Sequence, residues 1–519
     1  MAQVNFPFSD LRELLSVKKE WAMETLTMLG FPAEVTETGE LSVEVTPNRP
    51  DCLCVEGLAR TLRCYMTGRP AKFIVSGVKV AVTVDKTVSD VRPFFGAAVV
   101  HDIKMTESFL RSLMQVQEKL HETLGRKRKK VAIGIHDMDR VEMPFRYFAC
   151  GRKDISFVPL EMEKKMTPEE ILQKHPKGTE YAHLVGKLCP MITDRNGLVL
   201  SFPPIINGEL TKLTLKTRNL FIDCTGTSET AVRQAVNILC AMLSERGGKI
   251  EEAKINGKPY DLLLETKWVL PLKKTEQLLG TRMGSAKLKG LLAKMGFRPS
   301  GNAIFAPGYR ADVIDEVDLI EDAAIAFGFN NFEPSFPEFS SFGSSSAEKP
   351  LHELLVGLGY DEVMTWTLSN RELERKACLP ASRHVEIENP LTEDFTIFRP
   401  SLLPNLLAVL SESRNEKLPI RIYEAGPVAA PALEDSVCMA SMHARASFSE
   451  IKGAVLSLAE ALGRKAEIKA KDFPCFIPGR CAELLLDGKP CGFFGEISPE
   501  VLSNFSLEQP VCAAVLKGA

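Results

Sequence analysis

The sequence predicts a multidomain α+β protein. Its 519 residues are enough for three or four domains at roughly 150 residues each. A helix–hairpin–helix pattern occurs twice, once at the N-terminus and again after residue 265. Between and after the two copies, short β-branched segments alternate with longer amphipathic segments, a pattern typical of sheets covered by helices.

The two helix–hairpin–helix modules are expected over 1–75 and 265–335. In the first, a helix over 11–31 is followed by a hairpin, a strand and a further helix, which Asp51 is placed to cap. The second copy keeps this order and carries the hinge PGYRAD where the first has PNRPD. The modules are either a divergent internal repeat or similar units that recur by chance.

Residues 76–250 predict an α+β domain, with helices at 107–124 and 229–246 among short strand-like segments. The segment 333–350 is rich in Ser, Pro, Phe and Gly and is expected to be a linker. Residues 345–519 alternate helix and strand again, which predicts a final domain with helices packed on a sheet.

Bulk composition excludes several classes of protein. The net charge of −3 is wrong for a globally basic nucleic-acid binder, so any RNA contact would come from local patches. The longest apolar runs fall short of the roughly 20 residues that a spanning helix needs, so no membrane association and a cytoplasmic location are expected. The sequence carries neither a P-loop nor a GxGxxG nor a GxSxG motif.

The densest acidic cluster lies in the second module, at Asp312, Asp318, Glu321 and Asp322. The last three are spaced i, i+3 and i+4, so their carboxylates share one helical face, where like charges repel. A hard cation such as Mg2+ would relieve that repulsion. Acidic residues near a helix N-terminus are equally typical of a solvated face, so both interpretations are open.

Polar side chains also gather in the middle domain. In NLFIDCTGTSETAV, Asp223 and Thr225 end a strand and Ser228 is placed to cap the next helix, an arrangement that suits a hydroxyl-binding site or simply a capped turn. His136, Asp137 and Asp139 in GIHDMDR suit a metal or acid–base site, but three polar residues at the end of the strand VAIGIH more often form a turn. The basic run 126–130 is either a phosphate contact or a solvated loop.

Seven strings, in order along nearly the whole chain, resemble the β subunit of archaeal and eukaryotic phenylalanyl-tRNA synthetases. They are VEVTPNRPDCLCVEGLAR (43–60), VQEKLHETLGRKRKKVAIGIHDMDR (116–140), PPIINGE (203–209), LFIDCTGTS (220–228), RADVIDEVDLIEDAAIAFGFNN (310–331), NPLTEDFTIFRPSLLPNLL (389–407) and YEAGPV (423–428). Neither the tRNA-binding OB domain nor the anticodon-binding domain of bacterial β subunits has a counterpart segment here.

The resemblance implies a fold for each segment. The two modules look like the family's B1 and B5 domains, of winged-helix-like type, and 76–250 looks like its B3/B4 editing domain. The last domain resembles a degenerate class II synthetase domain built on an antiparallel sheet. Class II sites hold ATP with an arginine and a glutamate at a set spacing, and Arg421 and Glu424 do not keep that spacing.

The resemblance also implies a function. The chain would support phenylalanine–tRNA ligase, with ATP and the aminoacylation site on an α subunit in an α2β2 assembly that binds tRNA(Phe). It would also hydrolyse mischarged Tyr-tRNA(Phe). The chain could instead be a scaffold of the complex that does not edit, or a free-standing nucleic-acid-binding protein of winged-helix type.

The family's site residues map onto particular positions of this chain. Mg2+ would be held by Asp312, Asp318, Glu321 and Asp322. The editing residues would be Asp223 and Thr225, with Ser201 and Asn207 lining the same site.

Overall fold

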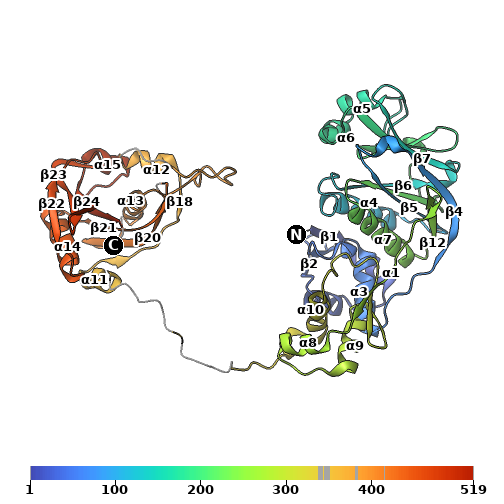
Figure 1. Ribbon diagram of the computed structural model, residues 1–519, viewed down its shortest axis with the longest axis horizontal. Coiled ribbons are helices and arrows are strands. Elements are labelled where there is room, and N and C mark those ends of the chain that lie inside the picture. The colour runs from blue at the N-terminus through green and yellow to red at the C-terminus, as the bar shows by residue number, and fades with distance from the viewer. Residues whose placement is uncertain are drawn as a thin grey trace. The chain divides into compact units, whose positions relative to one another are not determined.

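The computed structural model describes residues 2–336, 343, 351–379, 384–413, 415–429 and 431–517. The chain forms two compact units, an N-terminal unit over Met1–Phe336 and a C-terminal unit over Pro337–Ala519. The first three expected segments fall in the N-terminal unit and the fourth in the C-terminal unit (Figure 1). The segment expected to be a linker, 333–350, lies mostly outside the described residues.

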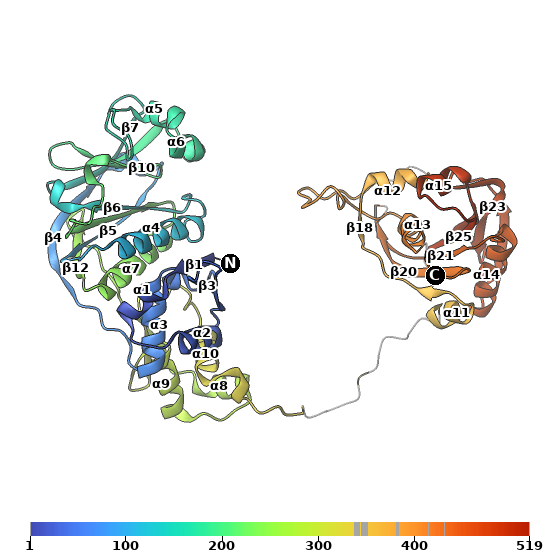
Figure 2. The ribbon, with the colours of Figure 1, turned by 180° about the vertical axis from the view of Figure 1, so that it is seen from behind.

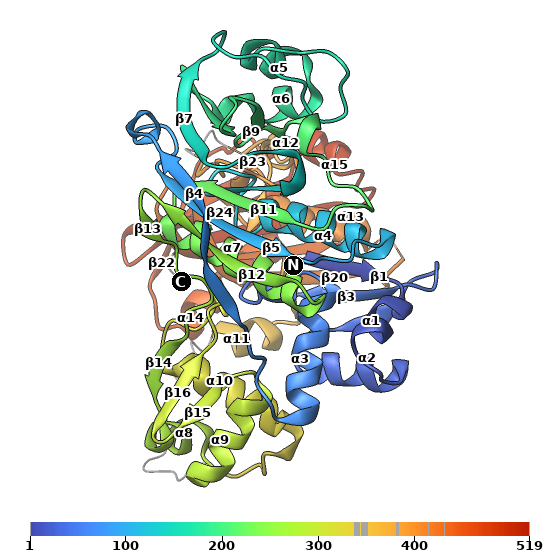
Figure 3. The same cartoon turned by 90° about the vertical axis from the view of Figure 1, so that its right-hand side faces the viewer.

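The two modules share one order of elements and one strand order. The first contains β1 (Ala2–Phe6), α1 (Phe8–Leu14), α2 (Lys19–Met28), β2 (Ala33–Val35), β3 (Leu41–Val45) and α3 (Val55–Thr67), with the sheet order β1-β3-β2. The second contains β14 (Thr266–Val269), α8 (Leu272–Leu279), α9 (Gly284–Lys294), β15 (Arg298–Ser300), β16 (Ala303–Ala306) and α10 (Glu316–Phe327), with the order β14-β16-β15 (Figure 3). This match favours the internal repeat over chance recurrence.

Two details of the first module differ from the sequence predictions. The helix expected over 11–31 is broken, because Leu15 takes an extended conformation with its side chain in the core. Asp51 does not cap α3, which begins at Val55 with Cys54 as its N-cap. Instead Asp51 is buried, and its carboxylate accepts hydrogen bonds from Arg49 at 2.9 and 3.0 Å and from Arg60 at 3.2 Å. Two guanidinium groups close by compensate its removal from water.

A sheet of ten strands forms the middle of the N-terminal unit. Along its path the order is β10 (Ile206–Asn207), β9 (Val199–Phe202), β8 (Leu188–Thr193), β7 (Phe145–Gly151), β4 (Val75–Val84), β12 (Lys249–Ile255), β5 (Phe94–His101), β11 (Leu220–Gly226) and β6 (Val131–Asp137), and β13 (Lys258–Pro259) pairs with β12. The helices α4 (Glu107–Glu122) and α7 (Glu229–Glu245) lie on one face (Figure 2). Both were expected from the sequence, as was the Ser228 cap of α7.

Alternation along β11 divides its side chains between two cores. Ile222 and Cys224 pack into the core that contains α4 and α7. Phe221 points to the other face and packs with Phe145 and Tyr147. Because side chains alternate along a strand, Asp223 lies on the face of Phe221, away from the helices.

The C-terminal unit is built on a seven-stranded sheet in which only the β17–β20 pair is parallel, within the described residues. The order is β17 (Asp361–Glu362), β20 (Ile420–Ala429), β21 (Leu433–Met442), β25 (Val511–Lys517), β24 (Lys489–Ile497), β23 (Phe476–Leu486) and β22 (Ala466–Ala470), and the short strands β18 (Leu368–Ser369) and β19 (Ile397–Phe398) pair apart from it. One face packs on α12 (Arg371–Lys376), α13 (Leu403–Glu412) and α15 (Pro499–Asn504), the other on α11 (Leu351–Gly357) and α14 (Phe448–Ala461).

Across the described part of the chain, no helix combines the length and the apolar character that crossing a membrane requires.

Candidate active site

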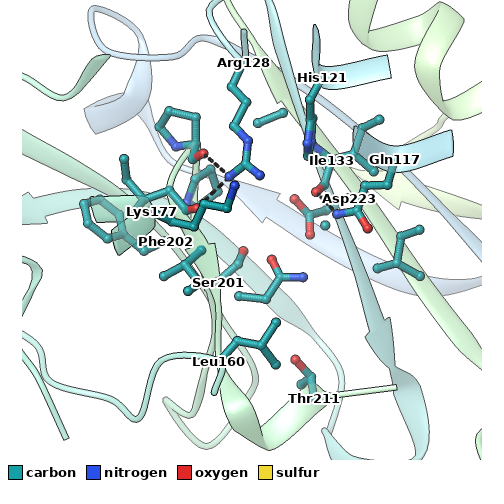
Figure 4. A pocket seen from close by; sticks show the side chains of 18 of the residues that line it. Gln117, His121, Arg128, Ile133, Leu160, Lys177, Ser201, Phe202, Thr211 and Asp223 are labelled. Atoms are coloured by element: carbon teal, nitrogen blue, oxygen red, sulfur yellow. Dashed lines mark hydrogen bonds between the residues drawn. The ribbon is translucent and has the colours of Figure 1, made fainter. Parts of the chain in front are cut away.

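A cavity of about 370 Å³ opens in the middle domain between the two ends of the ten-stranded sheet (Figure 4). The strands β6 and β10 are the two edges of that sheet, yet both contribute to the wall of the cavity. The helix α4 and the strand β11 supply further wall. A cavity of this size suits a small ligand or the end of a larger one.

Asp223 of β11 is the buried carboxylate of this cavity, with 1% of its surface exposed. Its Oδ2 lies 2.7 Å from Nε2 of His136 on the neighbouring strand β6. Gly134 is the residue paired directly with Asp223 across the two strands. A Cβ atom at position 134 would lie only 2.1 Å from that oxygen, so the glycine provides the space for the carboxylate.

The strand VAIGIH was expected to give way at His136 to a turn of polar residues, whereas β6 runs on through Asp137, so His136 lies within the strand. The histidine is fully buried and its Nδ1 lies 2.7 Å from the hydroxyl of Thr211. Thr211 follows β10 in a short 3-10 helix, Glu209–Thr211. The sequence did contain a usable signal, since alternation along VAIGIHD places His136 on the same face as Gly134.

Three of the four residues expected for editing line the same cavity. Asp223, Ser201 and Asn207 all contribute to its wall, and Ser201 and Asn207 are paired across β9 and β10. The Ser201 hydroxyl is buried, and in the described part of the chain it has no hydrogen-bond partner. A buried polar atom without a partner costs free energy unless a ligand or water completes it, so this atom marks a place where a polar ligand group can bind.

Thr225, the fourth, has a different environment. Its hydroxyl accepts a hydrogen bond from Nε of the buried Arg92 at 2.9 Å, and its carbonyl accepts one from the same guanidinium at 2.8 Å. Arg92 also donates to the carbonyl of Arg128 at 3.0 Å. Thr225 is therefore joined, through Arg92, to the turn that precedes β6.

That turn contains the basic run 126–130, whose first three residues share an unusual backbone conformation. Arg126, Lys127 and Arg128 have φ angles of 47°, 53° and 64°, in the left-handed region that side chains with a Cβ rarely adopt. Arg128 is buried and the first two are exposed. The guanidinium of Arg128 donates to the carbonyls of Pro204 and Ile205 at 3.3 and 2.8 Å, so Arg128 connects the two edges of the sheet across the cavity.

Side chains of α4, among them Gln117 and His121, form another part of the wall (Figure 4). Gln117 donates to the carbonyl of Ile133 at 2.8 Å, and the amide of Ile133 donates to Nε2 of His121 at 2.9 Å. Glu118 accepts from Arg128 at 2.9 Å, and its pKa is lowered to about 2, first by His121 and then by Arg128. The helix is thus fixed to β6 and to the basic turn.

The acidic residues of the second module do not converge on one point. Arg310 pairs with Asp312 at 2.7 Å and with Asp322 at 2.5 Å, so a guanidinium already balances these two carboxylates. Asp318 accepts from the amides of Ile314 and Asp315 in the capping box of α10.

The fourth, Glu321, is exposed. Within the residues that the structure describes, no three His, Cys, Asp or Glu side chains are placed to hold a metal ion. The arrangement does not fit Mg2+ as it stands, and a Mg2+ site at these residues stays a prediction from the resemblance.

Family models match three parts of the chain. Residues 111–253 match the B3/4 domain, residues 269–329 the tRNA synthetase B5 domain, and residues 342–517 the phenylalanyl tRNA synthetase beta chain CLM domain. The cavity lies largely within the first of these matches.

Curated relatives match the chain from end to end. The phenylalanine–tRNA ligase beta subunit of Archaeoglobus fulgidus is 39% identical, over 99% of this chain and 97% of that one. The corresponding subunit of Methanosarcina barkeri is 39% identical, over 98% and 97%. Among solved structures, an N-terminal fragment of the phenylalanyl-tRNA synthetase beta subunit from Pyrococcus horikoshii superposes with a TM-score of 0.59 at 32% identity, covering 63% of this chain and 99% of the fragment.

Proposed function

The chain belongs to the family of phenylalanine–tRNA ligase β subunits, and on that premise we propose that it completes the ligase with an α subunit and hydrolyses Tyr-tRNA(Phe) in the cavity around Asp223. In this proposal the α subunit carries ATP, its Mg2+ and the aminoacylation site in an α2β2 assembly. The present chain supports the attachment of phenylalanine to tRNA(Phe) in the cytoplasm without catalysing it.

The contacts of the C-terminal unit support this division of labour. Arg421, the arginine nearest to a class II pattern, is paired with Glu450 at 3.2 Å. Glu424 is buried and accepts from Arg399 at 2.6 Å and from the hydroxyl of Thr365 at 2.6 Å. Each of these side chains is engaged within the unit, which does not suit them to binding a nucleotide.

Editing has a physical cause. An apolar pocket shaped for phenylalanine rejects tyrosine only weakly, because the two side chains differ by one hydroxyl, so some tRNA(Phe) becomes charged with tyrosine. A second pocket that hydrogen-bonds the hydroxyl discriminates far better, since phenylalanine would leave its polar groups unpaired.

The cavity has the groups that such discrimination needs. Asp223 supplies a buried hydrogen-bond acceptor, and Ser201 supplies a hydroxyl that lacks a partner among the described residues. A nucleophilic serine needs a base in contact with its hydroxyl, so Ser201 is not activated for attack on the ester. Water is therefore the attacking group in this proposal.

The observation that carries the proposal is the Asp223 carboxylate, 1% exposed, in the wall of a cavity of about 370 Å³. The test is Asp223→Ala in the full chain co-expressed with its α subunit, with deacylation of Tyr-tRNA(Phe) as the measurement. A hydrogen bond to a charged group contributes about 1.5–3 kcal/mol, so kcat/KM should fall by about 10- to 100-fold while phenylalanylation continues.

Asp90→Ala is the matched control, because Asp90 is an exposed aspartate of the same domain. It should leave both activities unchanged. If Asp223→Ala deacylates Tyr-tRNA(Phe) like the wild type, the editing assignment is wrong and the chain is a scaffold that does not edit.

A further inference from the structure

We propose that His136 is a positioning residue that holds Asp223 as a hydrogen-bond acceptor and thereby sets the preference of the cavity for tyrosyl over phenylalanyl esters. This inference rests on the proposed editing function and adds a specificity determinant to it. His136 acts through Asp223 from behind the wall of the cavity.

The geometry is a chain of three side chains that crosses from one part of the sheet to the other. Asp223 on β11 contacts His136 on β6, and His136 contacts Thr211, which follows β10. Both contacts measure 2.7 Å, and the three residues are at most 1% exposed. Because β6 and β10 are opposite edges of the sheet, the imidazole links the carboxylate to the far wall of the cavity.

The surroundings of the ring leave it little freedom. His136 is fully buried and stacks on Phe221, with ring centroids 6.2 Å apart and planes inclined by 29°. A Cβ atom at Gly134 would come within 2.7 Å of its Nε2. The ring is thus packed from two sides and oriented by hydrogen bonds at both nitrogens.

A count of protons assigns the direction of the two hydrogen bonds. A neutral imidazole donates from one nitrogen and accepts at the other, and an ionised carboxylate only accepts. If Nε2 carries the proton, it donates to Asp223 while Nδ1 accepts from the Thr211 hydroxyl, and both contacts of 2.7 Å are satisfied.

The opposite direction fits less well. If Nδ1 carried the proton, the Thr211 hydroxyl would have to accept it and donate elsewhere, and its other acceptor, the carbonyl of Gly208, lies 3.4 Å away. A contact of that length is a poor hydrogen bond. The geometry therefore assigns an ionised Asp223 that receives the Nε2 proton of a neutral His136.

The consequence is a rule for recognition. With one carboxylate oxygen held by His136, Asp223 presents its remaining acceptor capacity to the cavity and has no proton to give. A phenol hydroxyl can donate to such a group, whereas a phenyl ring cannot and would leave the carboxylate desolvated and incompletely paired. Loss of the Nε2 donor would let the Asp223 carboxylate rotate, and the discrimination would weaken.

The test compares two variants at position 136 in the full chain co-expressed with its α subunit. His136→Phe keeps a ring but removes both nitrogens, and His136→Gln keeps an amide that can donate to Asp223. The measurements are kcat and KM for deacylation of Tyr-tRNA(Phe) and of Phe-tRNA(Phe), together with the melting temperature and phenylalanylation.

We expect His136→Phe to lower the ratio of the two kcat/KM values, tyrosyl over phenylalanyl, by about 10-fold or more, since a charged hydrogen bond is at stake. His136→Gln should recover part of that ratio, and phenylalanylation should be unaffected. Thr211→Val removes the hydroxyl that fixes the imidazole proton, and it should lower the ratio by a smaller factor. If His136→Phe does not fold, the ratio measured for Thr211→Val tests the role of His136 instead.

Two results would overturn the inference. One is a wild-type ratio in His136→Phe, or in Thr211→Val where His136→Phe does not fold. The other is an equal loss for both substrates, which would indicate a general structural role. Asp223→Ala distinguishes the two levels of the argument. If it too deacylates Tyr-tRNA(Phe) normally, the editing function itself fails, whereas a loss in Asp223→Ala beside normal His136→Phe refutes only the role of His136.

Discussion

Gly134→Ala is a sharp test of how the cavity holds Asp223, because it adds one methyl group and removes no functional one. The new Cβ atom would lie 2.1 Å from Oδ2 of Asp223 and 2.7 Å from Nε2 of His136. Ordinary contacts of a Cβ atom begin at 3.4 Å, so the carboxylate has to move by more than about 1 Å. The obstacle is the end of a side chain rather than backbone, so the strand itself can stay in place.

The effect of Gly134→Ala on stability is the sum of a favourable backbone term and unfavourable steric and polar terms. Replacing a strand glycine by alanine stabilises a protein by about 0.5–1 kcal/mol through backbone entropy. Overpacking costs about 1–3 kcal/mol, and loss of a hydrogen bond to a charged group costs about 1.5–3 kcal/mol. The steric and polar costs win, so we expect a net destabilisation of about 1–3 kcal/mol and a fall of about 10- to 100-fold in deacylation of Tyr-tRNA(Phe).

The assay is the same deacylation reaction with the complete complex, together with urea unfolding to measure the free energy. Gly77→Ala in β4 is the matched control, because nothing lies within 4 Å of the Cβ atom that it would add. It should leave deacylation unchanged and the stability equal or slightly higher. A Gly134→Ala variant that edits like the wild type would refute the idea that the position of the Asp223 carboxylate matters for hydrolysis.

Two further predictions concern the paired modules. Asp51→Ala should lower the free energy of unfolding by about 3–5 kcal/mol, because it leaves the buried guanidinium groups of Arg49 and Arg60 unpaired. Urea denaturation measures this loss, and a value below about 1 kcal/mol would contradict the prediction. Burial raises the pKa of Asp51, but Arg49 and Arg60 outweigh burial, so the pKa of Asp51 is lowered in the folded protein. The ion pairs therefore contribute their full stability above the unfolded pKa of about 3.9, and this stability is lost as the pH falls through the lower folded pKa. For the acidic cluster, Mg2+ should not raise the melting temperature of the EDTA-treated full chain; a rise that Asp318→Ala abolishes would instead support the metal site that the resemblance implies.

The sequence predicted the parts of the fold that depend on local pattern. The helices α4 and α7 and the Ser228 cap were expected because apolar periodicity and capping residues act over a few positions. The repeated module was also visible in the order of its elements. What the sequence could not show is that the edge strands β6 and β10 lie across one cavity, since that placement depends on the curvature of the whole sheet.

In the candidate site too, the sequence predicted some residues, whereas the roles of others depend on tertiary contacts. Asp223, Ser201 and Asn207 were expected together and line one cavity. For His136 a turn was preferred to an acid–base site, because the sequence does not show that its imidazole contacts Asp223 and Thr211. Arg128 was one of five basic residues in a row, and nothing in that run shows that its guanidinium is the one that reaches the carbonyls of Pro204 and Ile205.

The meeting of the two sheet edges at the cavity also matters for solubility. An unpaired strand edge is a template on which other chains can add, and proteins usually cover or interrupt such edges. Here Arg128 and the His136–Thr211 contact join the two edges across the cavity, so we expect the side chains that shape the cavity also to limit the pairing of β6 and β10 with another molecule. Variants that open the cavity would therefore be prone to aggregate as well as impaired in hydrolysis, and the two defects would appear together.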